Sequence, residues 1–214
     1  MVKKYWIIVV IAFTFSCASS KFIEPLEKKQ SAISLDIGGP LIDFNGATIP
    51  VPLSSINYGY GLKENLSVFS SLHLTSLVFN NFHSEIGVLK KIYFQNKFIP
   101  SVSSSFSLNF ITELSLGNSK IWPQIESNAF WKIGKNRLHL GGLIMIDSEI
   151  VNTDVAYLIN PHIGYTKSFN KINVGVEVKF LAPLNDNTKV FLPYNSLTGD
   201  YGATGVYLNF TKRF

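Results

Sequence analysis

Polar and apolar residues alternate along most of the chain from residue 31 onward, and this period of two predicts β-strands. In residues 172–180, INVGVEVKF, the apolar side chains occupy every second position, and Asn, Gly, Glu and Lys occupy the positions between them. The same alternation predicts about ten strands (eight to twelve), at 31–37, 53–62, 65–77, 83–91, 98–112, 122–133, 137–147, 156–169, 172–182 and 202–214. The sequence therefore indicates an all-β, antiparallel domain over residues 31–214.

The connections between these strands alternate in length. Short turns are expected at 63–64, 134–136 and 170–171, with a slightly longer one near 95–96, whereas 38–52, 113–121, 148–155 and 183–201 are longer and irregular. The connection near Asn80 is the short exception on that second side. Short turns at one end and long loops at the other are typical of up-and-down transmembrane β-barrels.

The polar face of the predicted strands carries few charges. Charged residues make up 15% of the chain and hydrophobic residues 46%, and there are 17 Phe, 9 Tyr and 3 Trp. A soluble sandwich would solvate its polar face with many charges, whereas Ser, Gly and Asn suit the narrow interior of a small barrel. We therefore expect the apolar face to contact lipid. A soluble β-barrel or sandwich remains the alternative.

The first residues have the pattern of an export signal. Lys3 and Lys4 precede an apolar run over 5–15, which is shorter than the about 20 residues that a membrane-spanning helix needs. A short basic segment followed by such a run predicts a signal peptide over residues 1–16. Its removal would lower the formal net charge from +5 to +3, because two lysines leave with it. That weak charge argues against nucleic acid as a partner.

The lone cysteine, Cys17, directly follows the apolar run. Thr14-Phe15-Ser16-Cys17-Ala18 resembles the lipobox of bacterial lipoproteins. The resemblance implies cleavage before Cys17, lipid attachment to it by the lipoprotein-processing machinery, and membrane lipid as a partner. Residues 17–30 would then be a lipidated, flexible tether. The alternative is an unmodified thiol beside an ordinary signal-peptidase site.

The last strand, GVYLNFTKRF, ends on an aromatic residue with apolar residues at every second position before it. This resembles the C-terminal strand signal of bacterial outer-membrane β-barrel proteins. The resemblance implies that Phe210 and Phe214 are read by the barrel-assembly machinery. It also implies a Gram-negative-type outer membrane, and an even strand number then places both termini in the periplasm.

The polar face also carries the ionisable residues that chemistry would require. We expect a lumen polar network formed by Glu126, Lys132, His139, His162, Glu177 and Lys179. Its simplest role is to fill the barrel interior with interlocking charges. His139 and His162 with Glu126 or Glu177 could instead bind zinc or act as a general base. The chain contains no GxSxG, HExxH or glycine-rich phosphate loop, so we expect no catalytic residues, no metal and no cofactor.

These patterns together predict a non-enzymatic outer-membrane lipoprotein barrel with a structural, surface-interaction or limited small-solute passage role. The long connection 183–201 is the expected site for a surface partner, because it carries apolar residues beside Asn and Asp. Two alternatives remain open. One is an outer-membrane lipid-modifying hydrolase, and the other is a lipid-tethered soluble β-barrel that binds an apolar ligand.

Overall fold

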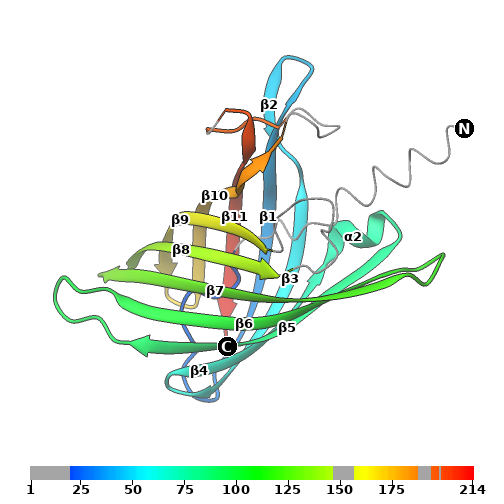
Figure 1. Ribbon diagram of the computed structural model, residues 1–214. Helices are drawn as coiled ribbons and strands as arrows, with labels where there is room; N and C mark the ends of the chain where they lie inside the picture. Colours follow the sequence, from blue (N-terminus) through cyan, green and yellow to red (C-terminus); the bar gives the residue numbers. More distant parts are fainter. Residues whose placement is uncertain (1–19, 147–156, 188–193, 198) are drawn as a thin grey trace, which may run out of the picture.

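The computed structural model describes residues 20–146, 157–187, 194–197 and 199–214. Within these residues the chain forms a closed, antiparallel β-barrel (Figure 1). Its ten wall strands are β1 (Ser31–Phe44), β3 (Leu53–Lys63), β4 (Leu66–His73), β5 (Asn81–Tyr93), β6 (Ser101–Glu113), β7 (Ser119–Ile133), β8 (Asn136–Ile146), β9 (Tyr157–Phe169), β10 (Ile172–Asp186) and β11 (Tyr201–Arg213). The predicted fold class is confirmed.

The barrel closes because the last strand pairs with the first. β11 runs antiparallel to β1 over nine residue pairs, from Ala32 opposite Arg213 to Pro40 opposite Gly205. Every other neighbour in the wall is consecutive along the chain, apart from β2 (Ala47–Pro50) between β1 and β3. Closure leaves no unpaired edge in the wall, which is the condition for a sheet to exist in lipid.

The two faces of the wall differ as the alternation predicts. Exposed apolar side chains cover the outside, with Ile33, Tyr58, Ile86, Phe106, Leu140, Ile163 and Leu208 among them. Ser, Asn, His and charged side chains point inward and are buried, including Ser34, Asn57, Ser107, Asn128 and Thr166. This is the inverse of a soluble domain, in which the apolar face is buried.

The short turns lie at one end of the barrel, which we call the short-turn end. The turns between β3 and β4, between β7 and β8, and between β9 and β10 are two residues long, and residues 94–100 join β5 to β6. Gly134 and Asn170 adopt positive φ angles of 61° and 51° in two of these turns. The opposite end, which we call the long-connection end, carries the remaining connections.

The connection 38–52 differs from the irregular loop that we expected. β1 continues to Phe44 and pairs with β2, so that the two form a hairpin projecting beyond the barrel (Figure 1). Asn45 and Gly46 form its turn with φ angles of 53° and 83°. Asn-Gly between two extended runs is the strongest short hairpin signal in a sequence, so this element was predictable.

The strand predicted over 65–77 also ends early. β4 stops at His73, and Leu74–Val78 forms the short helix α2. Thr75 fixes this corner, because its hydroxyl accepts a hydrogen bond from the Ser54 amide at 2.8 Å and donates one to the Pro52 carbonyl at 3.2 Å. Within the described residues, no helix is both long enough and apolar enough to cross a bilayer.

Residues 20–30 do not form the flexible tether that we expected from residues 17–30. Residues 20–26 pack inside the barrel, and residues 27–30 lie at the short-turn end, where 27–29 are exposed. We call residues 20–30 the lumen segment. Ile23 and Leu26 are 4% and 2% exposed. A segment that is enclosed by strands on all sides buries polar and apolar side chains alike. The predicted signal peptide and Cys17 lie outside the described residues.

Candidate functional site

The lumen segment is joined to the barrel wall by backbone hydrogen bonds at the short-turn end. The Lys29 amide donates to the Gly61 carbonyl at 2.8 Å, and the Gly61 amide donates to the Gln30 carbonyl at 2.9 Å. A Cβ atom on Gly61 would lie 1.9 Å from the Glu27 carbonyl oxygen. Glycine at this position therefore allows the segment to lie directly against β3.

Ion pairs at two places join the lumen segment to the barrel wall. Lys21 pairs with Glu85 of β5, and both side chains are buried. Glu24 is surrounded by cations, with Lys91 Nζ at 2.6 Å, Lys132 Nζ at 2.7 Å and Arg137 Nη1 at 3.7 Å from its carboxylate. Buried charges persist when they are paired in this way.

Glu24 belongs to the lumen segment and not to a membrane-spanning strand. Burial alone would raise the pKa of Glu24, but the hydrogen bonds and charges of Lys132 and Lys91 outweigh burial and hold this pKa below its usual value of 4.5. A carboxyl whose pKa is lower in the folded state stabilises that state above the unfolded pKa. This stabilisation is lost as the pH falls through the folded pKa.

We expect Glu24→Gln to lower the free energy of unfolding by about 1–3 kcal/mol at pH 7, because charged hydrogen bonds are lost. The difference from the wild type should shrink as the pH falls below 4.5. Denaturant unfolding followed by tryptophan fluorescence at several pH values measures both effects. Glu27→Gln is the matched control, since Glu27 is exposed on the same segment. A difference that is independent of pH would contradict the expectation.

Two adjacent hydrogen-bonded rows of the wall carry the central polar cluster. In one row, His139 of β8 lies opposite Gly164 of β9, which lies opposite Glu177 of β10. In the next row, Gly141 lies opposite His162, and His162 lies opposite Lys179. Each histidine therefore has a glycine as its neighbour across the β8–β9 pair.

The two glycines make room for the imidazole rings. A Cβ on Gly164 would lie 2.3 Å from the ring of His139, and a Cβ on Gly141 would lie 2.3 Å from Nε2 of His162. Each ring therefore extends over the neighbouring strand and reaches a group two strands away. We predict that Gly164→Ala costs about 1–3 kcal/mol of stability by overpacking, measured by denaturant unfolding. Gly142→Ala is the control, because its Cβ would meet nothing within 4 Å.

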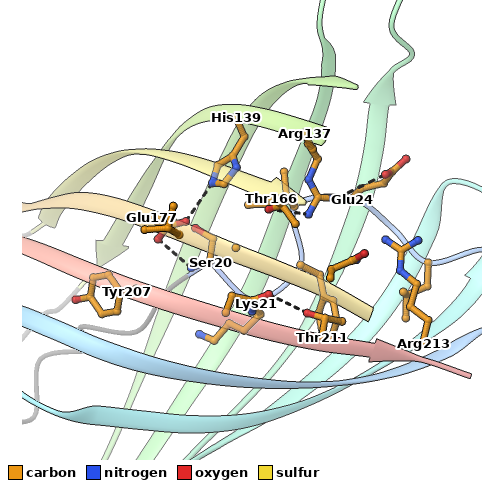
Figure 2. Close-up of a pocket in the computed structure, with 17 residues that line it drawn as sticks. Ser20, Lys21, Glu24, Arg137, His139, Thr166, Glu177, Tyr207, Thr211 and Arg213 are labelled. Carbon is orange, nitrogen blue, oxygen red and sulfur yellow. Dashed lines mark hydrogen bonds and ion pairs between the residues drawn. The ribbon is translucent and has the colours of Figure 1, made fainter. Parts of the chain in front are cut away.

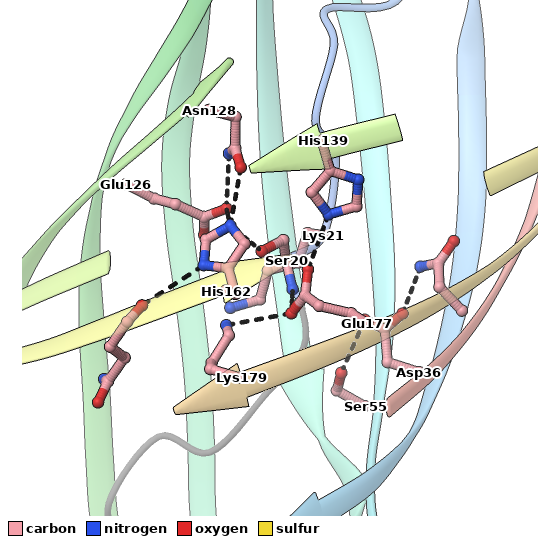
Figure 3. Close-up of polar contacts among 12 residues, drawn as sticks. Ser20, Lys21, Asp36, Ser55, Glu126, Asn128, His139, His162, Glu177 and Lys179 are labelled. Carbon is pink, nitrogen blue, oxygen red and sulfur yellow. Dashed lines mark hydrogen bonds and ion pairs between the residues drawn. The ribbon is translucent and has the colours of Figure 1, made fainter. Parts of the chain in front are cut away.

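The histidines contact carboxylates and amides across the lumen (Figure 3). His139 Nε2 lies 3.2 Å from Glu177 Oε2. His162 Nε2 lies 2.8 Å from the Asn128 amide oxygen, which accepts from it, and 3.7 Å from Glu126 Oε1. Asn128 in turn donates to Glu126 at 2.8 Å.

The tip of the lumen segment reaches the same cluster. The Ser20 amide donates to Glu177 Oε1 at 3.1 Å, and the Ser20 hydroxyl lies 3.3 Å from His162 Nε2. Lys179 Nζ is 3.4 Å from the same Glu177 oxygen. The lumen segment thus contacts the wall at both of its ends.

Five of the six residues predicted for the polar network lie in this cluster, namely Glu126, His139, His162, Glu177 and Lys179. Lys132 does not, since its side chain is 54% exposed at the short-turn end, where it pairs with Glu24. Sequence reasoning missed Ser20, Lys21, Glu24 and Asn128. Phe210 and Phe214 lie on the outer face, 41% and 57% exposed, and their role in assembly stays a prediction.

The cluster is not arranged as a nucleophile, base and orienting acid. Ser20 and Glu126 both approach the Nε2 atom of His162, whereas a relay needs the two ring nitrogens to face different partners. A cavity beside the cluster, between the lumen segment and β8–β11, has a volume of about 30 Å³ (Figure 2). That volume admits a few water molecules at most.

A second set of buried side chains fills the lumen toward the long-connection end. There an apolar cluster of inward side chains comprises Ile111, Trp122, Leu143, Met145 and Leu158. Each of them is at most 7% exposed, and Ala182 packs against them. Among the described residues, the interior therefore has three levels, which are the lumen segment, the polar cluster and this apolar cluster.

The solved structures to which the chain is similar include bacterial outer-membrane barrels. The chain is similar to an outer membrane channel from Pseudomonas putida F1 (TM-score 0.44, 10% identity, 92% of this chain and 99% of that one). It is also similar to the translocator domain of the autotransporter NalP from Neisseria meningitidis (TM-score 0.43, 10% identity, 90% and 91%). A third similar structure is the outer membrane protein OprG from Pseudomonas aeruginosa (TM-score 0.34, 10% identity, 90% and 99%). No protein-family model and no curated protein sequence matches the chain. Identities of this size carry no information on a substrate or partner.

Proposed function

We propose that this protein is a closed outer-membrane β-barrel with a structural or surface-interaction role and without an enzymatic one. The observation that supports this most strongly is the filled lumen. The lumen segment, the polar cluster and the apolar cluster around Trp122 occupy successive levels of the interior. Passage of a solute would require movement at all three levels, so we favour a closed barrel over the solute-passage role.

The apolar exterior supports the membrane location. Ile163 in the middle of β9 and Leu140 beside it on β8 are 42% and 45% exposed. Aromatic Phe169 and Phe214 are exposed at the short-turn end, where they would meet the lipid headgroups. We propose that this end faces the periplasm. Acylation of Cys17 stays a prediction from its sequence motif, and the position of Ser20 inside the lumen, three residues after it, does not support it.

The projecting hairpin supplies the surface for an interaction. All four residues of β2 are exposed, and Phe44 at the hairpin turn is 63% exposed. The described part of the connection 183–201 lies against it, because Tyr194 forms a β-bridge with Ile42, and the Asn195 amide donates to the Leu41 carbonyl at 2.9 Å. A surface partner would therefore contact the hairpin and this connection together.

Conductance in a planar lipid bilayer tests the closed state. We expect the full-length wild type and the Lys28→Ala control, which changes an exposed residue of the lumen segment, to show no ion channels. A combined Lys21→Ala, Glu24→Ala, Trp122→Ala and Glu177→Ala variant should open, because it loosens the lumen segment, the apolar cluster and the polar cluster together. Heat-modifiable gel migration shows whether each variant is folded. Steady conductance by the wild type would overturn the proposal.

A further inference from the structure

We infer that His139, His162 and Glu177 form a binding site for one divalent transition-metal ion of the zinc class in the middle of the lumen. The nearest ring nitrogens and carboxylate oxygen of these residues all lie within 4.8 Å of one another, and all three residues are buried. They come from three successive strands, β8, β9 and β10. The site goes beyond the closed-barrel role and departs from our expectation of no metal.

The donor set matches the chemistry of zinc. Two imidazoles and one carboxylate are a known set of three protein ligands, with a fourth position left for water or another oxygen. Zinc bonds of about 2.0–2.1 Å place neighbouring ligand atoms about 3.3 Å apart in a tetrahedron. The separation of 3.2 Å between His139 Nε2 and Glu177 Oε2 fits this value. His162 closes on the ion by exchanging its contact with Asn128 for a bond to the metal.

The outer contacts of two ligands are already in place. Glu177 uses Oε1 to accept from the Ser20 amide at 3.1 Å and to contact Lys179 Nζ at 3.4 Å, which leaves Oε2 for the metal. His162 carries its proton on Nε2 when it donates to Asn128. Metal binding requires the other tautomer, whose Nδ1 proton can be donated to the Asn160 carbonyl oxygen at 3.4 Å. Such partners orient metal ligands and raise their basicity.

The charges around the three ligands favour the binding of a cation. Glu126 and Glu177 bring two carboxylates to the cluster, and Glu126 Oε1 lies 3.7 Å from His162 Nε2. Lys179 contacts Glu177 and its charge also acts on Glu126, whereas Lys21 pairs with Glu85, so the two carboxylates share one ammonium group. Since buried carboxylates need compensating positive charge, an ion at the three ligands would supply it. Glu126 is also near enough to provide the fourth ligand or to hold a metal-bound water.

Space for the ligands is built into the wall. Gly141 and Gly164 both lack the Cβ that would collide with an imidazole ring. The water-sized cavity is lined by His139 and Glu177 among others. It therefore borders the site and provides space next to the ligands for a small ion or its water. Because Glu177 also holds the Ser20 amide, metal binding would strengthen the attachment of the lumen segment.

Isothermal titration with Zn²⁺ tests the site on the full-length protein in detergent micelles, after chelator treatment and dialysis. We expect one equivalent to bind, and Co²⁺ in its place should give the intense visible absorption of a tetrahedral site. His139→Gln and His162→Gln should each weaken binding by at least about tenfold. Heat-modifiable migration identifies the folded variants, and Glu177→Gln serves if either histidine variant does not fold.

His83→Gln is the matched control. His83 is also buried in the lumen, but it stacks on His73 with ring centroids 3.8 Å apart and contacts Asn109 at 3.2 Å, away from the three ligands. This variant should bind Zn²⁺ as the wild type does. Absence of binding by the wild type, undiminished binding by both ligand variants, or equal loss in the control would overturn the inference.

Discussion

A Lys21→Met variant is expected to lose about 3–5 kcal/mol of unfolding free energy, because it leaves the Glu85 carboxylate buried without its cation. The side chains of Lys21 and Glu85 are 5% and 0% exposed, respectively, so water cannot replace the missing partner. The loss should appear as a lower midpoint in denaturant unfolding of the full-length protein, followed by tryptophan fluorescence in lipid vesicles. It would show that the lumen segment is part of the cooperative fold.

Two further variants separate the charge from other effects. Lys21→Met combined with Glu85→Leu removes both charges, and its stability should return to within about 1 kcal/mol of the wild type, since a buried ion pair can be replaced by apolar residues at little cost. Lys28→Met changes an exposed lysine of the same segment and should alter stability by no more than about 0.5 kcal/mol. If Lys21→Met behaves as Lys28→Met does, the lumen segment does not stabilise the barrel.

The strands of the barrel wall could be predicted because the requirement on each residue depends only on the face to which its side chain points. Each strand must place apolar side chains on the lipid side and small polar ones inside, so the period of two persists from β1 to β11. The two errors in the wall have different causes, one a local turn signal and the other a contact with residues distant in the sequence. The Asn45-Gly46 pair makes the β1–β2 hairpin, and the hydroxyl of Thr75 holds the corner at α2.

The lumen segment was not predictable from the same reasoning. Residues 20–26 of this segment are enclosed by the barrel wall and lack a solvent face, so Ser20, Lys21, Ile23 and Glu24 are all buried without any period. Its mixture of charge, Ser and Pro resembles that of a flexible linker. The partners that make burial possible, Glu85 and Lys91, lie more than 60 residues away along the chain.

The central cluster was half predictable. Alternation assigns Glu126, His139, His162 and Glu177 to the inner face, and the structure buries all four there. Which of them meet depends on strand register and on the glycines between them. His139 contacts Glu177 across a strand because residue 164 has no side chain. The alternation of faces contains no information on such contacts between strands that are not direct neighbours.

An Ile163→Arg variant should lose about 2–4 kcal/mol of unfolding free energy in lipid vesicles, because it places a charge at mid-bilayer on the outer wall. Ile163 lies at the middle of β9, between Leu140 and Val178 of the neighbouring strands, and is 42% exposed. In a soluble barrel the same exposed position would tolerate arginine within about 0.5 kcal/mol. Denaturant unfolding therefore distinguishes the membrane barrel from the soluble alternative.

An outer-face position at a different depth in the bilayer provides the control for this experiment. Ile133 is also on the outer face, 65% exposed, but it directly precedes the turn between β7 and β8. Arginine there would reach the headgroups, so Ile133→Arg should cost only about 0–1 kcal/mol. Equal small losses at both positions would contradict a lipid-facing wall, and equal large losses would indicate packing against protein instead of lipid. A large loss at Ile163 with a small loss at Ile133 is the depth dependence expected in a bilayer, where the cost of a charge on the lipid face falls from the midplane to the headgroups.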